Sequence, residues 1–444
     1  MSTNPLNRRR LIAGIATGTA AVLSKPQTSA AAPAPEDTKA VAKAKPAKGT
    51  VGWPRWDGRE EEGLLDVLHS GKWGRTGGDR KVAEFEAAFA EQMQAQYCVA
   101  TSSGTTALFT ALGALNIGPG DEVILPAYTW VATFNAITTS FALPIFVDSD
   151  LETLQIDANK VDAAISDATK LLLPVHLGGI PADMDRFSEI SKARQVPVIA
   201  DACQSHLAEW RDVPVGTQGL GGCFSFQASK NMTSGEGGAV ITNDEEFANK
   251  CYNFHTPGNP KPTDSVGRAA NFRLTEFQAG VLLAQLTRLE ENAKTRDANG
   301  AYLNEMLSEI PGITPAKNYA GCTRNAWHLY MFRYAPEQFS NLPRSRFLQE
   351  LRTLGLTASR GYDQLNTSTH VNALANNPHY QRIYGKQRMA QWLEANQCPV
   401  NDRVCEEAVW LGHRNLLGTR SDMEQMAEKI AKVQKLSSKL AAAS

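Results

Sequence analysis

Residues 221–244, GGCFSFQASKNMTSGEGGAVITND, place one lysine, Lys230, in a loop of small residues between two short apolar runs. The runs 223–227 and 239–242 are predicted to be β-strands. A lysine on a loop that leaves a strand is positioned to form a Schiff base with a carbonyl cofactor, because small neighbours let a ligand approach the backbone. A solvated turn lysine is the alternative for this stretch alone, so the rest of the chain has to decide between the two.

Upstream of this stretch, short apolar runs alternate with helical segments. Strands are predicted at 98–101, 122–125, 145–148, 171–176 and 197–201, and helices between them at 105–115, 129–139, 160–165 and 185–194. Repeated strand–helix units with non-alternating apolar strands predict an α/β fold with a mainly parallel seven-stranded sheet covered by helices. Ligands bind at the carboxyl ends of the strands in such sheets, so the informative residues should follow each run.

Two of these strand ends carry residues that suit an aromatic phosphate ligand. The turn 102–108, SSGTTAL, opens into a helix, and its free N–H groups and hydroxyls are suited to hold a phosphate, although ordinary N-capping explains it equally well. Trp130 stands at a helix start where core packing does not require a large aromatic side chain, so it is available to stack on a planar ring.

Asp201 follows another predicted strand and is the partner that a lysine-bound cofactor needs. A carboxylate at a strand end can pair with a protonated ring nitrogen, and Gln204 three residues later can donate to a ring oxygen. Helix or turn capping is the alternative role for Asp201. Together Lys230 and Asp201 supply the two groups that pyridoxal phosphate requires, one for its aldehyde carbon and one for its pyridine nitrogen.

Composition excludes several other classes of function. The 444 residues carry 45 Lys+Arg against 46 Asp+Glu, so no strong global field recruits nucleic acid or an anionic membrane, and a small-molecule ligand is expected. The seven cysteines are scattered without a C-x-x-C pair, so neither a disulfide framework nor a metal site is indicated.

The N-terminus is predicted to be separate from the folded enzyme. Arg8 and Arg9 precede a mildly apolar run and then small residues, so residues 1–32 resemble a twin-arginine export signal, too short in its apolar part to span a membrane. If this signal functions, the protein is expected to be exported to the periplasm or cell envelope. If it does not function, the protein is expected to be cytoplasmic. Residues 33–50 are Ala-, Pro- and Lys-rich and are predicted to be a disordered linker.

The folded part is predicted to contain a large domain, 51–310, and a smaller C-terminal α/β domain, 311–444. A long helix at 274–295 and a second at 296–310 should link them. His328 and His413 lie in the second domain and are candidates to reach the substrate, but an isolated histidine is more often structural.

Six stretches in the same order resemble one known family. They are SSGTTAL (102–108), GPGDEVILPAYTWVAT (118–133), PVHLGGIPADMD (174–185), DACQSHLAEW (201–210), FSFQASKNMTSGEGG (224–238) and NFRLTEFQAG (271–280). They resemble the DegT/DnrJ/StrS family of fold-type I pyridoxal-phosphate aminotransferases, and the likeness covers nearly all of the chain after residue 51. It implies transfer of an amino group from glutamate or glutamine to a keto-sugar or keto-cyclitol by a ping-pong mechanism.

The resemblance also implies roles for the matching residues. Lys230 would bind the cofactor covalently and transfer protons, Asp201 would pair with the pyridine nitrogen, and Gln204 would lie near the ring hydroxyl. The remaining implied cofactor contacts are Gly104, Thr105 and Ser225 at the phosphate, Trp130 on the ring, and Asn271 with Arg273 at the phosphate of the neighbouring subunit. The last pair implies a homodimer with composite active sites.

Three alternatives stay open at this point. VWLGHR (409–414) and VLLAQLTRLEE (281–291) resemble 3-amino-5-hydroxybenzoate synthases, which use the same cofactor to aromatise an amino-cyclohexenone. Those synthases commonly carry histidine at the position of Gln204, which favours ordinary transamination. Sugar dehydratases of the family replace the lysine by histidine, so Lys230 argues against that activity. An enzymatically idle binding or regulatory protein on the same fold is the third alternative, although it would not need Lys230, Asp201 and Ser225 together.

Overall fold

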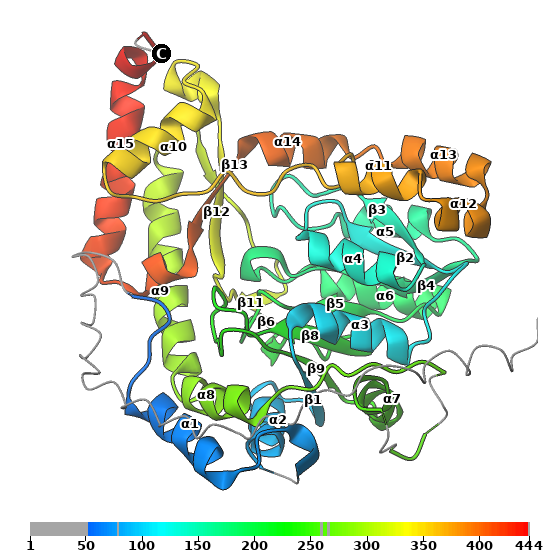
Figure 1. Cartoon of the computed structure of the whole chain (residues 1–444). Coiled ribbons are helices and arrows are strands. Elements are labelled where there is room, and N and C mark those ends of the chain that lie inside the picture. The colour runs from blue at the N-terminus through cyan, green and yellow to red at the C-terminus, as the bar shows by residue number, and fades with distance from the viewer. Residues whose placement is uncertain (1–51, 78–79, 258–260, 264–266, 443–444) are drawn as a thin grey trace, which may run out of the picture. The chain divides into compact units, whose positions relative to one another are not determined.

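Seven strands form the central sheet of the protein (Figure 1). The computed structural model describes residues 52–77, 80–257, 261–263 and 267–442. Isolated parallel bridges from Leu172 to Val198 and from Val175 to Asp201 join two smaller sheets into one, in the order β3–β2–β4–β5–β8–β9–β1. Their bounds are β1 Tyr97–Thr101, β2 Glu122–Pro126, β3 Leu143–Val147, β4 Thr169–Leu172, β5 Ile199–Asp201, β8 Gly221–Ser225 and β9 Gly238–Thr242.

The predicted mainly parallel, seven-stranded sheet is confirmed. Only β9 runs antiparallel to its two neighbours, β8 and β1, whereas β3, β2, β4, β5 and β8 pair in parallel. Parallel alignment brings the carboxyl ends of β5 and β8, which carry Asp201 and Ser225, to the same edge of the sheet. The fold therefore places the candidate residues of separate motifs close together.

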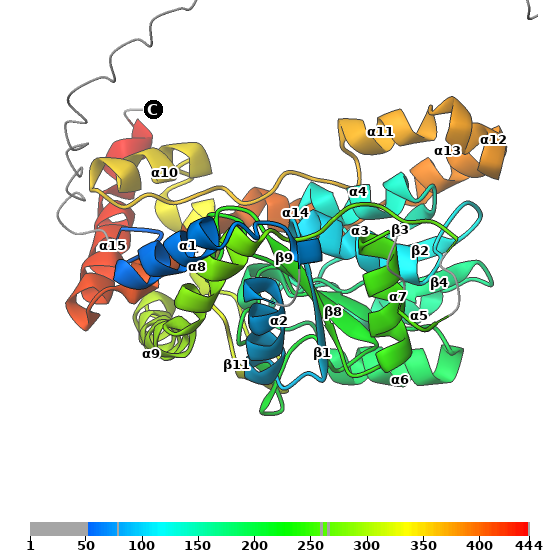
Figure 2. The same ribbon diagram turned by 60° about the horizontal axis from the view of Figure 1, so that its bottom comes forward.

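Both faces of this sheet are covered by helices, which is why its strands are largely apolar between their ends. In β9, Ala239 and Ile241 belong to one buried cluster with residues of α2, α6 and α8, while Val240 belongs to a second cluster with residues of α3, α4 and α7. These helices are α2 Lys81–Gln92, α3 Gly104–Ala114, α4 Val131–Thr139, α6 Met184–Arg194, α7 Glu245–His255 and α8 Glu276–Leu286. Figure 2 shows α2 and α7 beside β1, β8 and β9.

A second antiparallel sheet, β10–β12–β13, packs with α9, α10 and α15 around its own buried cluster. Between α10 and β13 the chain leaves this sheet and forms the helices α11–α14. Residues of α11–α13 belong to the same buried hydrophobic cluster as residues of α3 and α4, which cover the central sheet. The bounds are α9 Leu289–Ser308, β10 Ile313–Pro315, β12 Leu329–Tyr334, α10 Arg344–Thr353, α11 Thr369–Ala375, α12 Pro378–Tyr384, α13 Lys386–Ala395, α14 Pro399–Glu407, β13 Ala408–Gly412 and α15 Arg420–Ala442.

The remaining elements are short or lie at the margins of the sheets. A three-stranded antiparallel sheet, β11–β6–β7, joins the central part of the chain to the segment before β12. The bounds are α1 Gly58–Ser70, η2 Arg75–Gly77, α5 Ala158–Ala164, η3 Leu177–Gly179, β6 Glu209–Trp210, β7 Val213–Pro214, β11 Cys322–Arg324, η4 Pro336–Phe339 and η5 His413–Leu417.

The predicted helix pair 274–295 and 296–310 is wrong in its boundary, because the break lies between α8 and α9 at residues 287 and 288. The Thr287 hydroxyl donates to the Ala284 carbonyl, and the Arg288 guanidinium turns to bind Glu60 through two hydrogen bonds of 2.6 and 2.8 Å. These polar contacts end the first helix, although the hydrophobic periodicity continues across the break.

Some predictions lie beyond what the structure describes. The export signal at 1–32 and the linker at 33–50 fall outside the described residues, and export stays a prediction. The division at 310–311 also stays a prediction, since all described residues belong to one compact unit.

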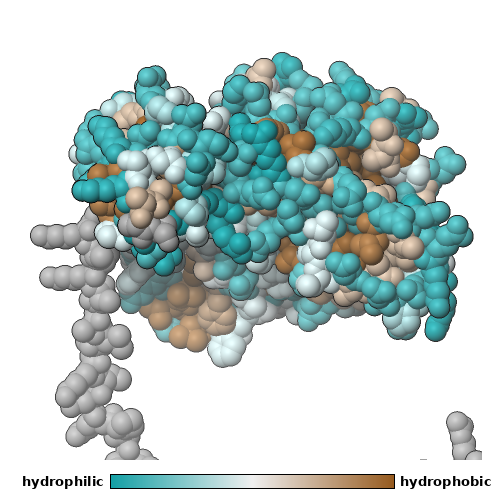
Figure 3. Space-filling model, turned by 90° about the horizontal axis from the view of Figure 1, so that it is seen from above, coloured by the Kyte–Doolittle hydropathy of each residue, from teal (hydrophilic) through white to brown (hydrophobic). Residues whose placement is uncertain are grey.

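No helix among the described residues is long and apolar enough to cross a membrane. The face in Figure 3 is mostly hydrophilic, with separate hydrophobic patches.

Candidate active site

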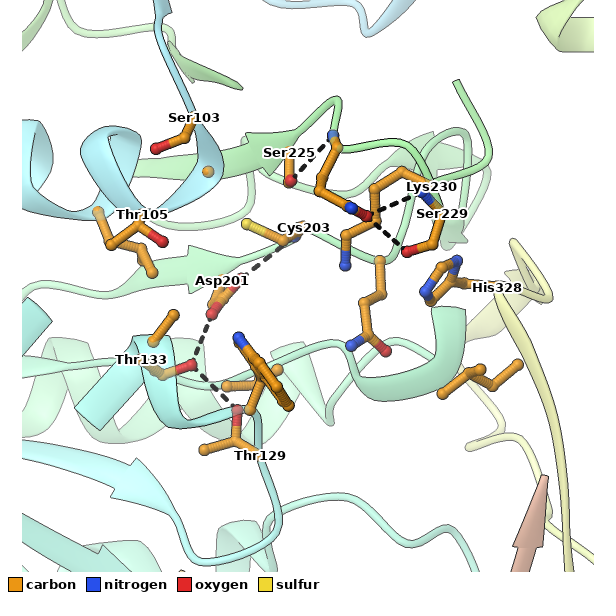
Figure 4. Close-up of a pocket in the computed structure, with 18 of the residues that line it drawn as sticks. Ser103, Thr105, Thr129, Thr133, Asp201, Cys203, Ser225, Ser229, Lys230 and His328 are labelled. Carbon is orange, nitrogen blue, oxygen red and sulfur yellow. Dashed lines mark hydrogen bonds between the residues drawn. The ribbon is translucent and has the colours of Figure 1, made fainter. Parts of the chain in front are cut away.

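Lys230 lies on the loop between β8 and β9, and its side chain lines a cavity of about 420 Å³ (Figure 4). Its backbone N–H donates to the Gln227 carbonyl at 2.8 Å, which closes a tight turn and fixes where the side chain leaves the loop. Burial lowers the pKa of the Lys230 ammonium below its ordinary value, while nearby Cys203 and Asp201 oppose that shift. Burial therefore shifts Lys230 toward the neutral amine, which is the nucleophilic form.

Two side chains from the C-terminal half hold the carbonyl groups on either side of Lys230. His413 Nε2 lies 3.0 Å from the Ser229 carbonyl oxygen, and Arg296 Nη2 donates to the Asn231 carbonyl at 3.3 Å. Both side chains are buried, so these bonds are shielded from water. The loop is thus braced from η5 and α9, which local sequence around the lysine could not have predicted.

Asp201 ends β5 and faces the same cavity as Lys230. The residue is 5% exposed, and its carboxylate accepts hydrogen bonds from Thr133 Oγ1 at 2.8 Å and from the Cys203 backbone N–H at 3.2 Å. The Thr133 hydroxyl lies 3.0 Å from that of Thr129, one turn earlier. No side chain of the described residues forms an ion pair with Asp201. A buried carboxylate supplied only with neutral donors can accommodate a cationic ligand group.

The start of α3 meets the end of β8 at the other end of the cavity. A Cβ atom added to Gly104 would lie 2.6 Å from the Ser225 Cβ and 2.9 Å from the Cys203 Sγ, so only glycine lets the helix start come this close. At the start of α3 the Thr106 N–H donates to the capping Ser103 hydroxyl at 3.1 Å, while Gly104 and Thr105, the first two residues of the helix, line the cavity together with Ser225. This arrangement is suited to an anionic group.

Gln204 links the sheet edge to an aromatic wall. Its Oε1 accepts from the Gly178 N–H at 2.7 Å, and its Nε2 donates to the Tyr362 hydroxyl at 3.1 Å. The Tyr362 ring lies 5.7 Å from that of Trp130 and 4.5 Å from that of Trp410, measured between centroids. Burial raises the pKa of the Tyr362 phenol to about 12, so this hydroxyl stays protonated at neutral pH.

Seven of the nine predicted site residues line this one cavity, and two do not. The seven are Gly104, Thr105, Trp130, Asp201, Gln204, Ser225 and Lys230.

Asn271 and Arg273 are absent from its described walls. Arg273 forms an isolated antiparallel bridge with Thr101, and the carbonyl of Phe272 accepts from the Ser102 N–H at 2.8 Å. Residues 271–273 therefore flank the turn at Ser102 that leads into α3. Their contact with a second subunit stays a prediction.

Sequence reasoning missed several residues that complete the cavity. Thr133 donates a hydrogen bond to Asp201 and lies four residues after Thr129. At a helix start this spacing brings two side chains together, so the sequence could have indicated the hydroxyl pair. Tyr362 and Trp410 come from the C-terminal half, and no local pattern connects them with residues some 150 positions earlier.

The residues present fit pyridoxal phosphate. The cavity offers an amine at Lys230, a buried carboxylate without a cationic partner at Asp201, and helix N–H groups with hydroxyls at the Gly104 turn. These match the aldehyde, the pyridine nitrogen and the phosphate of that cofactor, each at a separate place in one cavity. No group of three or more His, Cys, Asp or Glu side chains that could hold a metal ion occurs among the described residues.

Comparison with known proteins gives one family. The sequence model of the DegT/DnrJ/EryC1/StrS aminotransferase family matches residues 54–431, which is most of the chain. A 3-amino-5-hydroxybenzoate synthase of Amycolatopsis mediterranei is 34% identical over 384 residues, which cover 85% of this chain and 96% of that protein.

Two further similar proteins support the same grouping. An L-glutamine:2-deoxy-scyllo-inosose aminotransferase of Streptoalloteichus tenebrarius is 35% identical over 403 residues, which cover 86% of this chain and 94% of that one. The crystal structure of a 3-amino-5-hydroxybenzoic acid synthase superimposes with a TM-score of 0.74 at 33% identity, covering 86% of this chain and 98% of the other.

Proposed function

Because the chain belongs to the DegT/DnrJ/EryC1/StrS aminotransferase family, we propose that this pyridoxal-phosphate-dependent aminotransferase moves an amino group from glutamine to a keto-cyclitol. One observation carries the proposal: Lys230 and the buried, cation-free carboxylate of Asp201 face one cavity with the Gly104 turn. The donor and the acceptor class follow the L-glutamine:inosose aminotransferases among the relatives. Two half-reactions share one site, so ping-pong kinetics is expected.

Each residue of the cavity has a task in that reaction. Pyridoxal phosphate, when bound, supplies an electron sink for the carbon that loses or gains the amine. Lys230 would hold the aldehyde end and move a proton, since burial favours its neutral amine. Asp201 would keep the pyridine nitrogen protonated, while Ser225 and the start of α3 at Gly104 would bind the phosphate.

The charge of the cavity favours a small uncharged acceptor. Among the described residues that line it, Asp201, Lys230 and Glu236 are the charged side chains, and none is an arginine. A nucleotide-linked sugar carries a diphosphate that calls for arginine or lysine partners beyond the one lysine already used. A free keto-cyclitol has only hydroxyl and carbonyl groups, which the polar and aromatic walls can accommodate.

A synthase-like reaction is the second candidate, because a 3-amino-5-hydroxybenzoate synthase is among the most similar relatives. The same lysine would then remove a proton from a hydroxylated amino-cyclohexenone that also loses a hydroxyl group, so that water is eliminated and the ring aromatises. Gln204 favours transamination, since it is a neutral amide fixed between Gly178 and Tyr362 and cannot serve as a second base.

A spectroscopic assay tests the proposal. Purified protein with pyridoxal phosphate should show the visible band of the lysine-bound cofactor, and glutamine should convert that band to the near-ultraviolet band of the aminated form. Added scyllo-inosose or 2-deoxy-scyllo-inosose should then restore the visible band. A colourless protein would support an idle binding protein, and aromatic product from an amino-cyclohexenone without amine transfer would support the synthase alternative.

We also propose a homodimer in which Asn271 and Arg273 reach the phosphate of the partner's site. Asn271 is exposed, and neither residue lines the cavity of its own chain. Asn271→Ala should weaken cofactor binding about tenfold, since one hydrogen bond to a charged group contributes about 1.5 kcal/mol. Mixing N271A with K230A protein should yield hybrid dimers that carry one intact site, and this site should bind pyridoxal phosphate with the wild-type affinity. A mixture that shows only the weakened affinity of N271A would contradict the composite site.

A further inference from the structure

His328 is a buried histidine at the opposite side of the cavity from the phosphate-binding turn. It immediately precedes β12, is 6% exposed and lines the same cavity as Lys230. In Figure 4, Lys230 lies between the turn that carries Ser103 and Thr105 and the ring of His328. If the cofactor's phosphate occupies that turn, the space beside His328 remains for the molecule that reacts at the lysine end.

Hydrogen bonds fix which nitrogen of His328 carries the proton. Asn231 Nδ2 donates to the Ala326 carbonyl at 2.7 Å, and a carbonyl can only accept, so the orientation of the Asn231 amide is set. Its Oδ1 then faces His328 Nδ1 at 3.2 Å. An amide oxygen can only accept, so Nδ1 must be the donor. In a neutral ring the other nitrogen, Nε2, is left with a lone pair.

The surroundings keep this ring neutral. Burial, the largest cause, holds the pKa of His328 well below its ordinary value, and a proton on Lys230, His413 or His206 would lower it further. The His413 ring lies nearly parallel to it, with 5.7 Å between centroids, and burial lowers the pKa of His413 as well. Arg296 adds further positive charge from α9. The Nε2 atom therefore remains a hydrogen-bond acceptor at neutral pH.

We propose that His328 is a substrate-contacting residue whose Nε2 accepts a hydrogen bond from a ring hydroxyl of the keto-acceptor. The inference rests on the proposed function, since it requires a polyhydroxylated acceptor. An acceptor atom on the cavity wall favours a ligand that brings a donor, and a bound analogue that lacks the donor would cover Nε2 and leave it unpaired. His328 thus selects among keto-cyclitols by the presence of one hydroxyl.

A matched pair of variants tests this role. The Asn side chain of H328N reaches the position of Nδ1 and keeps the link to Asn231, whereas the Gln side chain of H328Q reaches the position of Nε2 and can present an oxygen there. H328N should lower kcat/KM for the acceptor half-reaction about tenfold, the loss of one buried hydrogen bond. H328Q should retain most of the wild-type kcat/KM for the acceptor half-reaction. In H328N the glutamine half-reaction, followed by the cofactor spectrum, should slow much less than the acceptor half-reaction, because glutamine brings no ring hydroxyl to Nε2.

Monodeoxy analogues of scyllo-inosose provide a measurement that needs no variant. One analogue should react about tenfold more slowly than scyllo-inosose with the wild-type protein, and H328N should remove that difference. Equal kcat/KM for all analogues with the wild-type protein would overturn the role of His328. Equal losses in both half-reactions of H328N would also overturn it, since they would mark a structural role. A wild-type protein that accepts glutamine but aminates no inosose refutes the proposed function itself.

Discussion

Lys230→Ala is expected to remove the visible absorption band and to lower kcat by at least roughly 10⁴-fold, because the lysine is both the covalent anchor and the proton carrier. The loop is braced through His413 and Arg296 rather than through the Lys230 side chain, so the variant should fold normally. The measurement is the absorption spectrum with pyridoxal phosphate, followed by single-turnover reaction with glutamine.

Lys317 offers a matched control for this prediction. Its ammonium lies 3.0 Å from Glu152, and both side chains are 61% exposed, so this ion pair contributes little. Lys317→Ala should therefore keep the band, the activity and the thermal stability of the wild-type protein. A visible band and an amine response in K230A would show that another group holds the cofactor, and would refute the assignment of Lys230.

The Lys230 loop shows why much of the site can be predicted from sequence. Strand ends in a parallel sheet converge, so a lysine, an aspartate and a small-residue turn that follow separate strands are brought to one edge by topology alone. The structure confirms this for Lys230, Asp201 and Gly104, which line one cavity. No contact between distant side chains had to be known to predict their proximity.

The contacts that residues of the C-terminal half make at the site could not be predicted in this way. Tyr362 reaches Gln204, and His413 reaches the Ser229 carbonyl, only because the chain returns after more than 150 residues. The break after α8 was missed for a related reason, since the partner of Arg288 is Glu60 in the first helix. Hydrophobic periodicity reports which face is buried, but it does not report a polar partner far away in the chain.

Asp201→Asn should lower kcat by roughly 10³-fold, or about 4 kcal/mol, while leaving the fold intact. Asparagine has nearly the same shape and can keep the hydrogen bond from the Cys203 N–H, but it carries no charge with which to hold a proton on the pyridine nitrogen. The cofactor would then accept electrons poorly. Thr133→Val serves as the graded control, because it removes one neutral donor and leaves the Asp201 side chain in place, and a loss of about tenfold is expected.

The two half-reactions distinguish this defect from the one expected at His328. When bound, the pyridine ring would serve as electron sink in both directions, so D201N should slow the glutamine and the acceptor half-reactions by similar factors, whereas H328N should slow the second much more than the first. Single-turnover spectra with each substrate measure the two rates separately. If D201N kept wild-type rates in both half-reactions, Asp201 would be a structural carboxylate whose hydrogen bonds from Thr133 and Cys203 only stabilise the strand end. The absence of an ion pair to Asp201 among the described residues argues against that outcome, because a buried charge held only by neutral donors is costly unless a cation joins it.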